Sequence, residues 1–224
     1  MIPDDIADSE RRESLSRILT ASSTVLDVGA NRGQFAKQLL SGVNCSIISF
    51  EPGGAAFEDL SAFAAKDPRV RPVKLVVAET TGSIEFFVQE SDLGSSLLPP
   101  VPGQTSRWAT FLETTVVEST RLDDFIDGND LGFIDLLKTD CQGADRRVLE
   151  SAGAHLVPDD IGALLVELNF HAFYEGQDSV GSVFDLANDH GYFLASMFRH
   201  FNREGWLWWA DALFLPNRPP FSTQ

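Results

Sequence analysis

Acidic and amide side chains in this sequence end two of its apolar runs. Asp140 ends one run, and Glu167 ends another, with Asn169 and His171 just beyond it. If both runs are neighbouring parallel strands, these side chains converge at one edge of the sheet. Two chemistries then fit: Asp140 or His171 acts as a general base, or Asp140, Glu167 and Asn169 bind Mg²⁺ or another divalent cation. Lys138 is a fourth catalytic candidate, although it could instead pair with a neighbouring acid, and His171 could be an ordinary surface histidine.

A glycine-containing segment, Asp27 to Gly33, follows the first apolar run and precedes a helical pattern. Gly29 and Gly33 permit a tight turn and close approach to a ligand, and the N–H groups that open a helix attract an anionic group. Glu51 ends the next apolar run, where a carboxylate can accept hydrogen bonds from both hydroxyls of a ribose. The spacing of Gly29, Asn31 and Gly33 departs from the dinucleotide pattern G-x-G-x-x-G, which favours S-adenosylmethionine over NAD. The alternative is that the glycines only turn a strand into a helix.

Positioning of these groups requires strands and helices that alternate along the chain. Apolar runs predict strands, and amphipathic or alanine-rich segments predict helices. We expect strands at 24–28, 46–50, 73–77, 134–138, 163–168, 192–198 and 208–215, and helices at 5–20, 35–40, 55–65, 144–149 and 180–190. This order predicts a Rossmann-like α/β fold: a mostly parallel seven-stranded sheet with an antiparallel edge hairpin and helices on both faces.

The stretch 91–120 differs from the rest of the chain because Gly, Ser and Pro crowd its first part. A long irregular segment suggests a functional loop, and we expect a lid here, with Trp108 and Phe111 in it. The remaining chain divides into an N-terminal helical segment at 1–22, one domain at 23–217 that contains the lid, and a tail at 218–224.

Composition bounds the class of protein. The chain has 224 residues, of which 43% are hydrophobic, as expected for one globular domain. The formal net charge of −16 disfavours nucleic-acid substrates, whose binding depends on Lys and Arg. No apolar stretch is long enough to span a bilayer and the N-terminus is charged, so we expect a cytoplasmic protein without membrane insertion. Cys45 and Cys141 are expected to be free thiols, and nothing indicates the oligomeric state.

Several ordered motifs together resemble the FkbM family of class I S-adenosylmethionine-dependent methyltransferases, over about residues 25–215. They are VLDVGANRGQFA, SFEPGGAAFEDL, LGSSL, TRLDDFI, DLLKTDCQGADRRVLESAG and LLVELNFH. The resemblance implies S-adenosylmethionine as cofactor. It further implies methyl transfer to a hydroxyl oxygen of a sugar, a glycan or a natural product, so the partner is a small-molecule or glycan acceptor.

The resemblance also implies roles for individual residues: the glycine segment holds the methionine end of the cofactor, Glu51 the ribose, and Ala78 with Glu79 the adenine. Ser95 and Ser96 match a serine pair of the family, although they could be a solvated turn. The expected cofactor-binding residues are Asp27, Gly29, Asn31, Gly33, Glu51, Pro52, Ala78, Glu79, Ser96 and Asp140. Where the family usually has Lys-Ile-Asp-Val-Glu-Gly, this chain has Lys138 to Gly143 with Gln142 in place of the acid.

Two other functions stay open. Cys141 and Gln142 would suit a regulatory or scaffold domain that binds the cofactor without catalysis. An N-methyltransferase is the other, but the Asp-Pro-Pro-Tyr or Asn-Pro-Pro-Tyr signature is missing after Asp140.

An aromatic cluster near the C-terminus could form a sugar-binding wall, because aromatic faces with polar neighbours suit that task. Packing at the sheet edge is the alternative that we favour. The cluster comprises Phe198, Phe201, Trp206, Trp208 and Trp209, with Arg199, His200, Asn202 and Arg203 between them.

Overall fold

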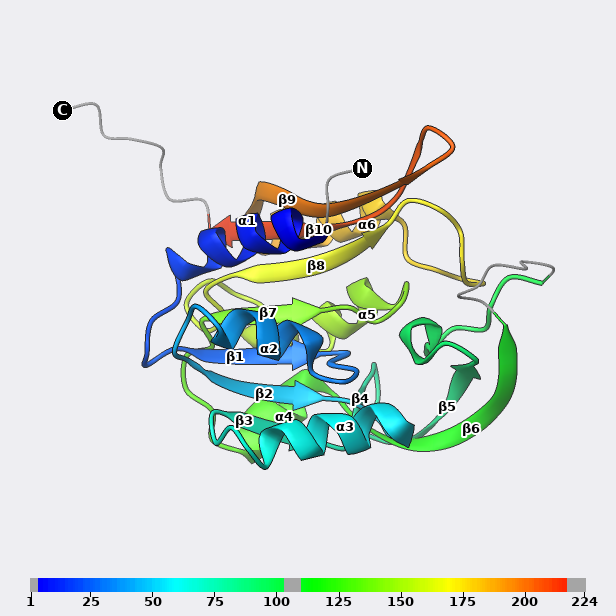
Figure 1. The fold of residues 1–224 in the computed structure, drawn as a ribbon, viewed down its shortest axis with the longest axis horizontal. Helices are drawn as coiled ribbons and strands as arrows, with labels where there is room; N and C mark the ends of the chain where they lie inside the picture. Colours follow the sequence, from blue (N-terminus) through cyan, green and yellow to red (C-terminus); the bar gives the residue numbers. More distant parts are fainter. Residues whose placement is uncertain (1–3, 103–109, 217–224) are drawn as a thin grey trace.

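A seven-stranded sheet forms the centre of the computed structural model, which describes residues 4–102 and 110–216 (Figure 1). Its order is β3-β2-β1-β7-β8-β10-β9. The strands are β1 (Thr24–Val28), β2 (Ser46–Phe50), β3 (Val70–Val73), β7 (Leu136–Thr139), β8 (Leu164–Asn169), β9 (Tyr192–Arg203) and β10 (Trp206–Pro216). The first five pair in parallel, whereas β10 runs antiparallel to both β8 and β9. The expected parallel sheet with an antiparallel edge hairpin is confirmed.

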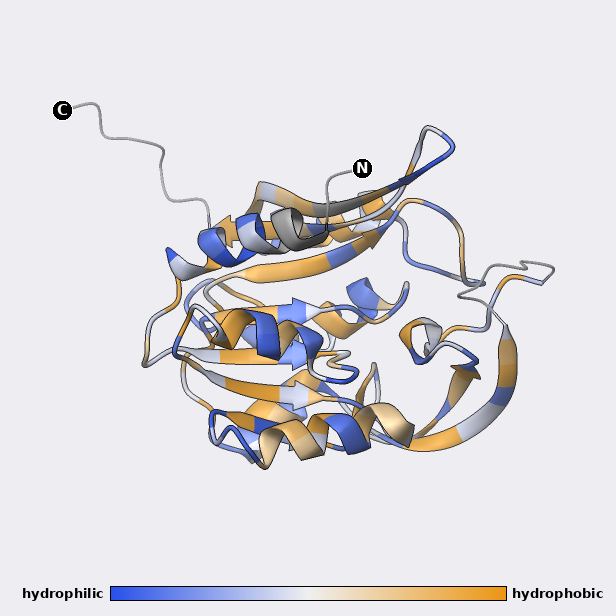
Figure 2. Ribbon diagram, viewed as in Figure 1, coloured by the Kyte–Doolittle hydropathy of each residue, from blue (hydrophilic) through white to orange (hydrophobic). Residues whose placement is uncertain are grey.

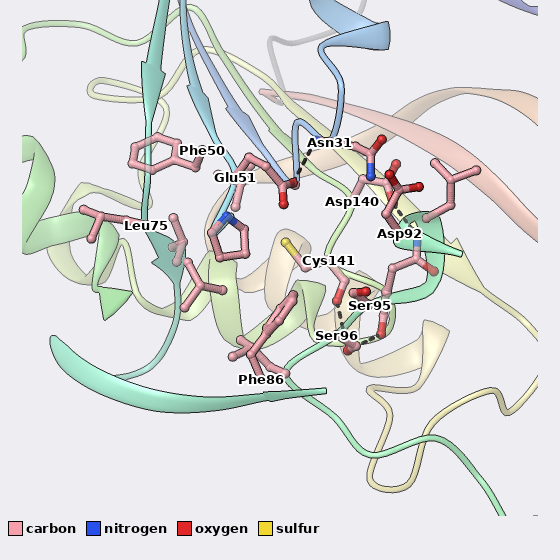
Figure 3. A pocket seen from close by; sticks show the side chains of 18 residues that line it. Asn31, Phe50, Glu51, Leu75, Phe86, Asp92, Ser95, Ser96, Asp140 and Cys141 are labelled. Atoms are coloured by element: carbon pink, nitrogen blue, oxygen red, sulfur yellow. Dashed lines mark hydrogen bonds between the residues drawn. The ribbon is translucent and has the colours of Figure 1, made fainter. Parts of the chain in front are cut away.

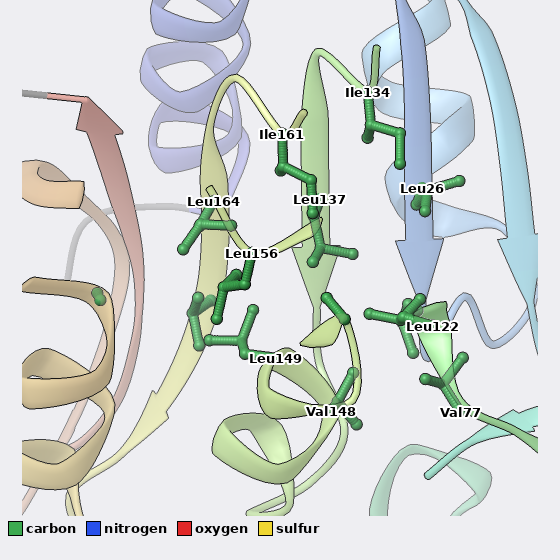
Figure 4. Close-up of a cluster of buried hydrophobic side chains, with 14 of the residues drawn as sticks. Leu26, Val77, Leu122, Ile134, Leu137, Val148, Leu149, Leu156, Ile161 and Leu164 are labelled. Atoms are coloured by element: carbon green, nitrogen blue, oxygen red, sulfur yellow. The ribbon is translucent and has the colours of Figure 1, made fainter. Parts of the chain in front are cut away.

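Helices cover both faces of the sheet, whose central strands are made mostly of hydrophobic residues (Figure 2). One face carries α1 (Asp4–Ser16), α2 (Gln34–Leu40) and α3 (Gly54–Ala64), whose Leu15, Leu39 and Leu60 are buried in one cluster. The other carries α4 (Leu122–Gly128), α5 (Asp145–Glu150) and α6 (Val180–Asp189). A second cluster fills that side (Figure 4). Among the described residues, no helix is long and apolar enough to cross a membrane.

The third strand differs from the prediction of 73–77. The main sheet uses Val70–Val73, which pairs with Ile47–Phe50, and the chain then leaves the sheet. Val76–Val77 forms β4, which pairs with Ser119–Thr120 in a separate sheet of order β4-β6-β5. The apolar run therefore covers a junction between two sheets, which hydrophobicity alone cannot reveal.

The region expected as a lid is only partly irregular. It contains the short 3₁₀ helix η1 (Asp92–Gly94), but its last part is strand β6 (Phe111–Thr120), which pairs with β5 (Gly82–Gln89). Much of β6 is exposed, so it lacks the buried apolar run that marks β1, β2, β7 and β8. The expectation of a loop to residue 120 was wrong for this reason. Trp108 and the tail at 218–224 lie outside the described residues.

The N-terminal segment is helical as expected, but α1 ends at Ser16 rather than near residue 20. Helix α4, of seven residues, was not predicted. A second 3₁₀ helix, η2 (Gly153–His155), follows α5.

Candidate cofactor and catalytic site

Two cavities open at the carboxyl ends of the parallel strands, where an open α/β sheet binds ligands. The first, which we call the cofactor cavity, has an empty volume of about 620 Å³ (Figure 3). The second, which we call the polar cavity, has about 1020 Å³ and lies toward α1 and α2. Both are lined by Gly29, Asn31, Leu93 and Asp140. The two cavities therefore meet at Asp140.

The glycine segment forms the turn from β1 into α2. Gly29 has φ 73°, and a Cβ there would overlap the backbone oxygen of Asp140. Gly33 also has a positive φ, but a Cβ there would contact Leu60 and Phe63 of α3 rather than a cavity. Gly29 thus allows β1 and β7 to approach at the cavity, whereas Gly33 serves helix packing rather than direct contact with a ligand.

Glu51 lies in the cofactor cavity at the end of β2, followed by Pro52. Its Oε2 accepts a hydrogen bond from the N–H of Asn31 at 3.0 Å, which ties β2 to the glycine segment. Burial raises the pKa of Glu51 to about 7, although the N–H groups of Asn31 and Gly53 oppose the shift. A ribose that donated its hydroxyls to this carboxylate would relieve the cost of burying its charge.

The cofactor cavity has an apolar wall that could hold a flat ring, and its residues differ from those expected to contact adenine. Phe50, Leu75, Val76, Val77 and Phe86 line the cofactor cavity. These side chains suit an adenine ring, because ligand sites are mostly apolar with few polar groups.

Ala78 and Glu79 line neither described cavity, which corrects their expected contact with adenine. Ala78 is buried with its N–H bonded to the oxygen of Thr120, and Glu79 is exposed with its carbonyl bonded to Arg121. The chain has already turned into the second sheet at this point.

Asp27 and Lys138 form an ion pair beneath the glycine segment, with Asp27 Oδ1 3.0 Å from Lys138 Nζ. Asp27 is fully buried and lines neither cavity, so its direct contact with the cofactor is corrected to support through Lys138. Burial would lower the pKa of Lys138, but the charges of Asp27 and Asp140 outweigh it and raise that pKa. Lys138 also donates to the carbonyl of Gly29 at 3.0 Å, and as a permanent cation it cannot act as a base.

Ser95 and Ser96 both line the cofactor cavity. The hydroxyl of Ser96 donates to the carbonyl of Gln142 at 2.9 Å, and that of Ser95 accepts from the N–H of Gln89. The pair therefore fixes the loop after β5 against the end of β7 rather than forming a solvated turn.

Gln142 joins the two carboxylates expected at the site. Its Nε2 donates to Asp140 Oδ1 at 2.8 Å and to Glu167 Oε2 at 3.0 Å. Its Oε1 accepts from the Tyr174 hydroxyl at 3.1 Å. Burial and then the neighbouring Asp140 charge raise the pKa of Glu167 well above its usual range. The expected convergence of Asp140 and Glu167 is observed, with Gln142 as the bridge.

The arrangement does not fit the divalent cation considered for Asp140, Glu167 and Asn169. The amide N–H groups of Gln142 and Asn169 point at the carboxylate oxygens, the latter at 3.2 Å from Glu167 Oε2. A cation requires oxygen lone pairs in those positions. Within the described residues, no three His, Cys, Asp or Glu side chains cluster as a metal site. We assign no step to a metal.

His171 lines neither cavity, which corrects its place among the catalytic candidates. Its ring stacks on Trp208 with centroids 4.7 Å apart. Phe201 stacks on Trp209 at 4.0 Å, and Arg203 lies over Trp208.

The C-terminal aromatic cluster thus packs largely upon itself along the β9–β10 hairpin, as the packing alternative predicts. Phe198 belongs to the buried core, whereas Trp206 is 75% exposed. Nothing is described of the Arg199 and His200 side chains.

Two residues at the site were not predicted, because only tertiary contacts bring them there. Asp92 lines the cofactor cavity and pairs with Arg32, Oδ2 to Nη2 at 2.6 Å, which ties η1 to the glycine segment. Tyr174 supports Gln142 from a loop without a recognisable motif. The departure of Gln142 from the family pattern was the signal available for this bridge.

Comparison with known proteins identifies the family of this chain. The FkbM methyltransferase domain profile matches residues 27–194. A relative from Sinorhizobium fredii, the 2-O-methyltransferase NoeI, is 27% identical over 184 residues, covering 78% of this chain and 75% of the relative.

Solved structures share the fold. TrmK of M. capricolum, in complex with S-adenosylhomocysteine, has a TM-score of 0.54 at 10% identity, covering 93% of this chain and 68% of that one. A Burkholderia thailandensis 1,6-didemethyltoxoflavin-N1-methyltransferase gives 0.53 at 15% identity, with 95% and 79% covered. The profile match, the fold and the cavity at the glycine segment together establish that the chain belongs to the FkbM family of S-adenosylmethionine-dependent methyltransferases.

Proposed function

We propose that the protein methylates a hydroxyl oxygen of a sugar, a glycan or another hydroxyl-rich small molecule. The observation that carries this proposal is the position of Asp140 at the junction of the two cavities. A group there can contact the cofactor on one side and accept a proton from an acceptor hydroxyl on the other. S-adenosylmethionine, when bound, supplies an electrophilic methyl carbon.

The surrounding residues hold Asp140 in place for this task. Gln142 donates to one carboxylate oxygen, Oδ1, and leaves Oδ2 directed elsewhere, 3.8 Å from Lys138 Nζ. Lys138 in turn is fixed by Asp27 and the carbonyl of Gly29. Such fixed geometry matters because methyl transfer depends mainly on alignment of the reacting atoms.

Two further facts support a hydroxyl acceptor. The relative from Sinorhizobium fredii is named a 2-O-methyltransferase. The net charge of −16 opposes attraction of nucleic acid.

The test measures transfer from methyl-labelled S-adenosylmethionine to neutral glycosides and hydroxylated aromatic compounds. Asp140→Asn should lower turnover about 10²–10⁴-fold, the contribution of a positioned general base. Its affinity for S-adenosylhomocysteine should change much less, because the apolar wall and Glu51 remain. Asp189→Asn, at the exposed end of α6, is the matched control and should have wild-type turnover.

Unchanged turnover in Asp140→Asn would refute the base assignment. Binding of the cofactor without transfer to any hydroxyl acceptor would favour a regulatory domain, and transfer only to amines would favour an N-methyltransferase. EDTA should leave turnover unchanged, because the amide donors at Asp140 and Glu167 do not suit a cation.

A further inference from the structure

The polar cavity lies between α1, α2, the end of β7 and the strands β8 and β10. Its polar lining includes Arg11, Gln34, Gln38, Glu167 and Asp211. We propose that this cavity binds the methyl acceptor and selects an uncharged, hydroxyl-rich molecule over an anionic one. The inference rests on the proposed methyl transfer and names the site and charge class of its acceptor.

The position of the cavity fits an acceptor. It shares Asp140 with the cofactor cavity, but Glu51, Pro52 and the apolar wall line only the cofactor cavity. A molecule in the polar cavity would therefore reach Asp140 without competing for the groups suited to ribose and adenine. An acceptor hydroxyl and the cofactor would then meet at the residue proposed as the base.

The lining has the chemistry of a polyol site. Carboxylate and amide groups accept hydrogen bonds from hydroxyls, and the amides of Gln34 and Gln38 can also donate. Phe35 and Leu165 add apolar surface between the polar groups, which suits the C–H faces of a sugar ring. A mixed wall of this kind matches a hydroxyl-rich molecule better than a wholly apolar one.

The charges of the lining disfavour an anion. Both cations that face the cavity are in ion pairs: Arg11 with Asp211 at 2.5 Å, and Lys138 with Asp27 at 3.0 Å. Asp140 faces the same space. An acceptor carboxylate or phosphate would approach this negative charge with both cations already neutralised by an acid, which is unfavourable in a partly buried site.

Helix α1 completes the cavity, although it lies outside the residues that the family profile matches. Arg11 is only 4% exposed, and besides its pair with Asp211 it donates to Gln38 Oε1 at 2.6 Å. The N-terminal helix is thereby fixed to α2 and to β10 across the cavity.

The test changes one exposed lining residue. Gln34 begins α2 and contacts Asn31, so Gln34→Lys adds a cation at the cavity without removing a buried group. Ala62→Lys, exposed on α3 and lining neither cavity, is the matched control for added charge. The probes are methyl glycosides of neutral hexoses and deoxyhexoses, each paired with its uronate, with methyl-labelled S-adenosylmethionine.

The wild type should show at least about tenfold higher kcat/KM for the best neutral glycoside than for its uronate. Gln34→Lys should reduce that ratio at least about fivefold with its affinity for S-adenosylhomocysteine changed less than about threefold, and Ala62→Lys should leave both at wild-type values. These margins correspond to a single charge in a partly screened site.

Several results would overturn the inference. The first is a preference of the wild type for uronates, and the second is an unchanged neutral-to-uronate ratio in Gln34→Lys. The third is a loss of cofactor affinity in Gln34→Lys, which would assign the polar cavity to the methionine end of the cofactor. Transfer to hydroxylated aromatic compounds but to none of the glycosides would also overturn it while leaving hydroxyl methylation intact. Failure of the proposed function would differ, because no hydroxyl compound of any class would be methylated.

Discussion

The two cavities on either side of Asp140 are built in different ways. Half of the residues that line the cofactor cavity come from the short segments that end β1, β2 and β7, and the rest come from residues 75–77, Phe86 and residues 92–97. The polar cavity comes from side chains of helices and strands that are distant in sequence, with Arg11 and Asp211 200 residues apart. The strand-end half of the first cavity can therefore be recognised from local motifs, whereas the second cavity depends on how the elements pack.

The largest expected loss of stability comes from a substitution in the polar cavity. Arg11→Ala would leave Asp211 buried without its cation, and the loss of one partner of a buried pair costs about 3–5 kcal/mol of unfolding free energy. Chemical denaturation monitored by circular dichroism measures this loss. Arg17→Ala, in the segment after α1, is the matched control because its pair with Glu13 is exposed, and it should cost less than about 1 kcal/mol.

The same variant also tests whether a change in the polar cavity affects ligand binding in the cofactor cavity. If stability permits assay, Arg11→Ala should retain affinity for S-adenosylhomocysteine within about threefold, because α1 does not line the cofactor cavity. A stability loss below about 1 kcal/mol would show that the Arg11 pair is not an anchor.

A somewhat smaller effect is expected at the turn shared by both cavities. Gly29→Ala combines an unfavourable positive φ with overlap against the backbone of Asp140, so we expect a loss of about 3 kcal/mol. Gly54→Ala is the control, since its φ of 64° is similar but a Cβ there meets nothing within 4 Å. It should cost about 1–2 kcal/mol.

Thermal unfolding of the two glycine variants separates the stability cost of the positive φ from the cost of the overlap with the Asp140 backbone. Gly29→Ala should also abolish measurable cofactor binding, because β1 and β7 must separate to make room for the alanine side chain. Equal stability of the two variants would contradict the close approach as the reason for glycine at position 29.

The smallest expected effect comes from a substitution in the cofactor cavity. Glu51→Gln removes the charged acceptor for the ribose hydroxyls and should weaken cofactor binding about 10-fold, as expected for a hydrogen bond to a charged group. Isothermal titration calorimetry measures the dissociation constant. The variant should leave the preference for neutral over anionic acceptors unchanged, and an altered preference would contradict the separation of the two cavities.

The pH dependence of binding follows from the pKa of Glu51, which burial raises to about 7. Ribose hydroxyls stabilise the anion and lower that pKa, so cofactor binding should release about half a proton at pH 7 and weaken as pH falls below 7. The stability of the free protein depends on pH in the opposite direction to cofactor binding. Protonation is favoured in the folded state, so Glu51 contributes stability below the ordinary glutamate pKa of 4.5 that is lost as pH rises through about 7.

Calorimetry in buffers of different ionisation enthalpy counts the protons released. Glu51→Gln is the control for other titrating groups, and it should release fewer protons than the wild type. Equal release would assign the proton to another residue.

Much of the fold could be predicted because its central strands β1, β2, β7 and β8 are buried on both faces and read as apolar runs. Strands β1, β2 and β8 lie within one residue of their predicted bounds at each end. The prediction was wrong where burial does not follow that pattern, as in the largely exposed β6 and at the junction after β3. Because of the same junction, Ala78 and Glu79 line neither cavity, whereas residues 75–77 line the cofactor cavity.

The sequence by itself determined the glycine segment and the strand-end carboxylate of the cofactor cavity. Asp27 to Gly33 and Glu51 lie at strand ends, and the chain order of strand, turn and helix brings such segments to one edge of a parallel sheet. It also placed Asp140 and Glu167 at neighbouring strand ends.

Only the tertiary structure decided what surrounds Asp140. It placed the Gln142 amide between the two carboxylates, removed His171 from the site, and closed a second cavity with Arg11 and Asp211. These contacts join side chains from elements that are neighbours in space alone, and the physical reason is that packing, which has no local sequence signature, sets their distances.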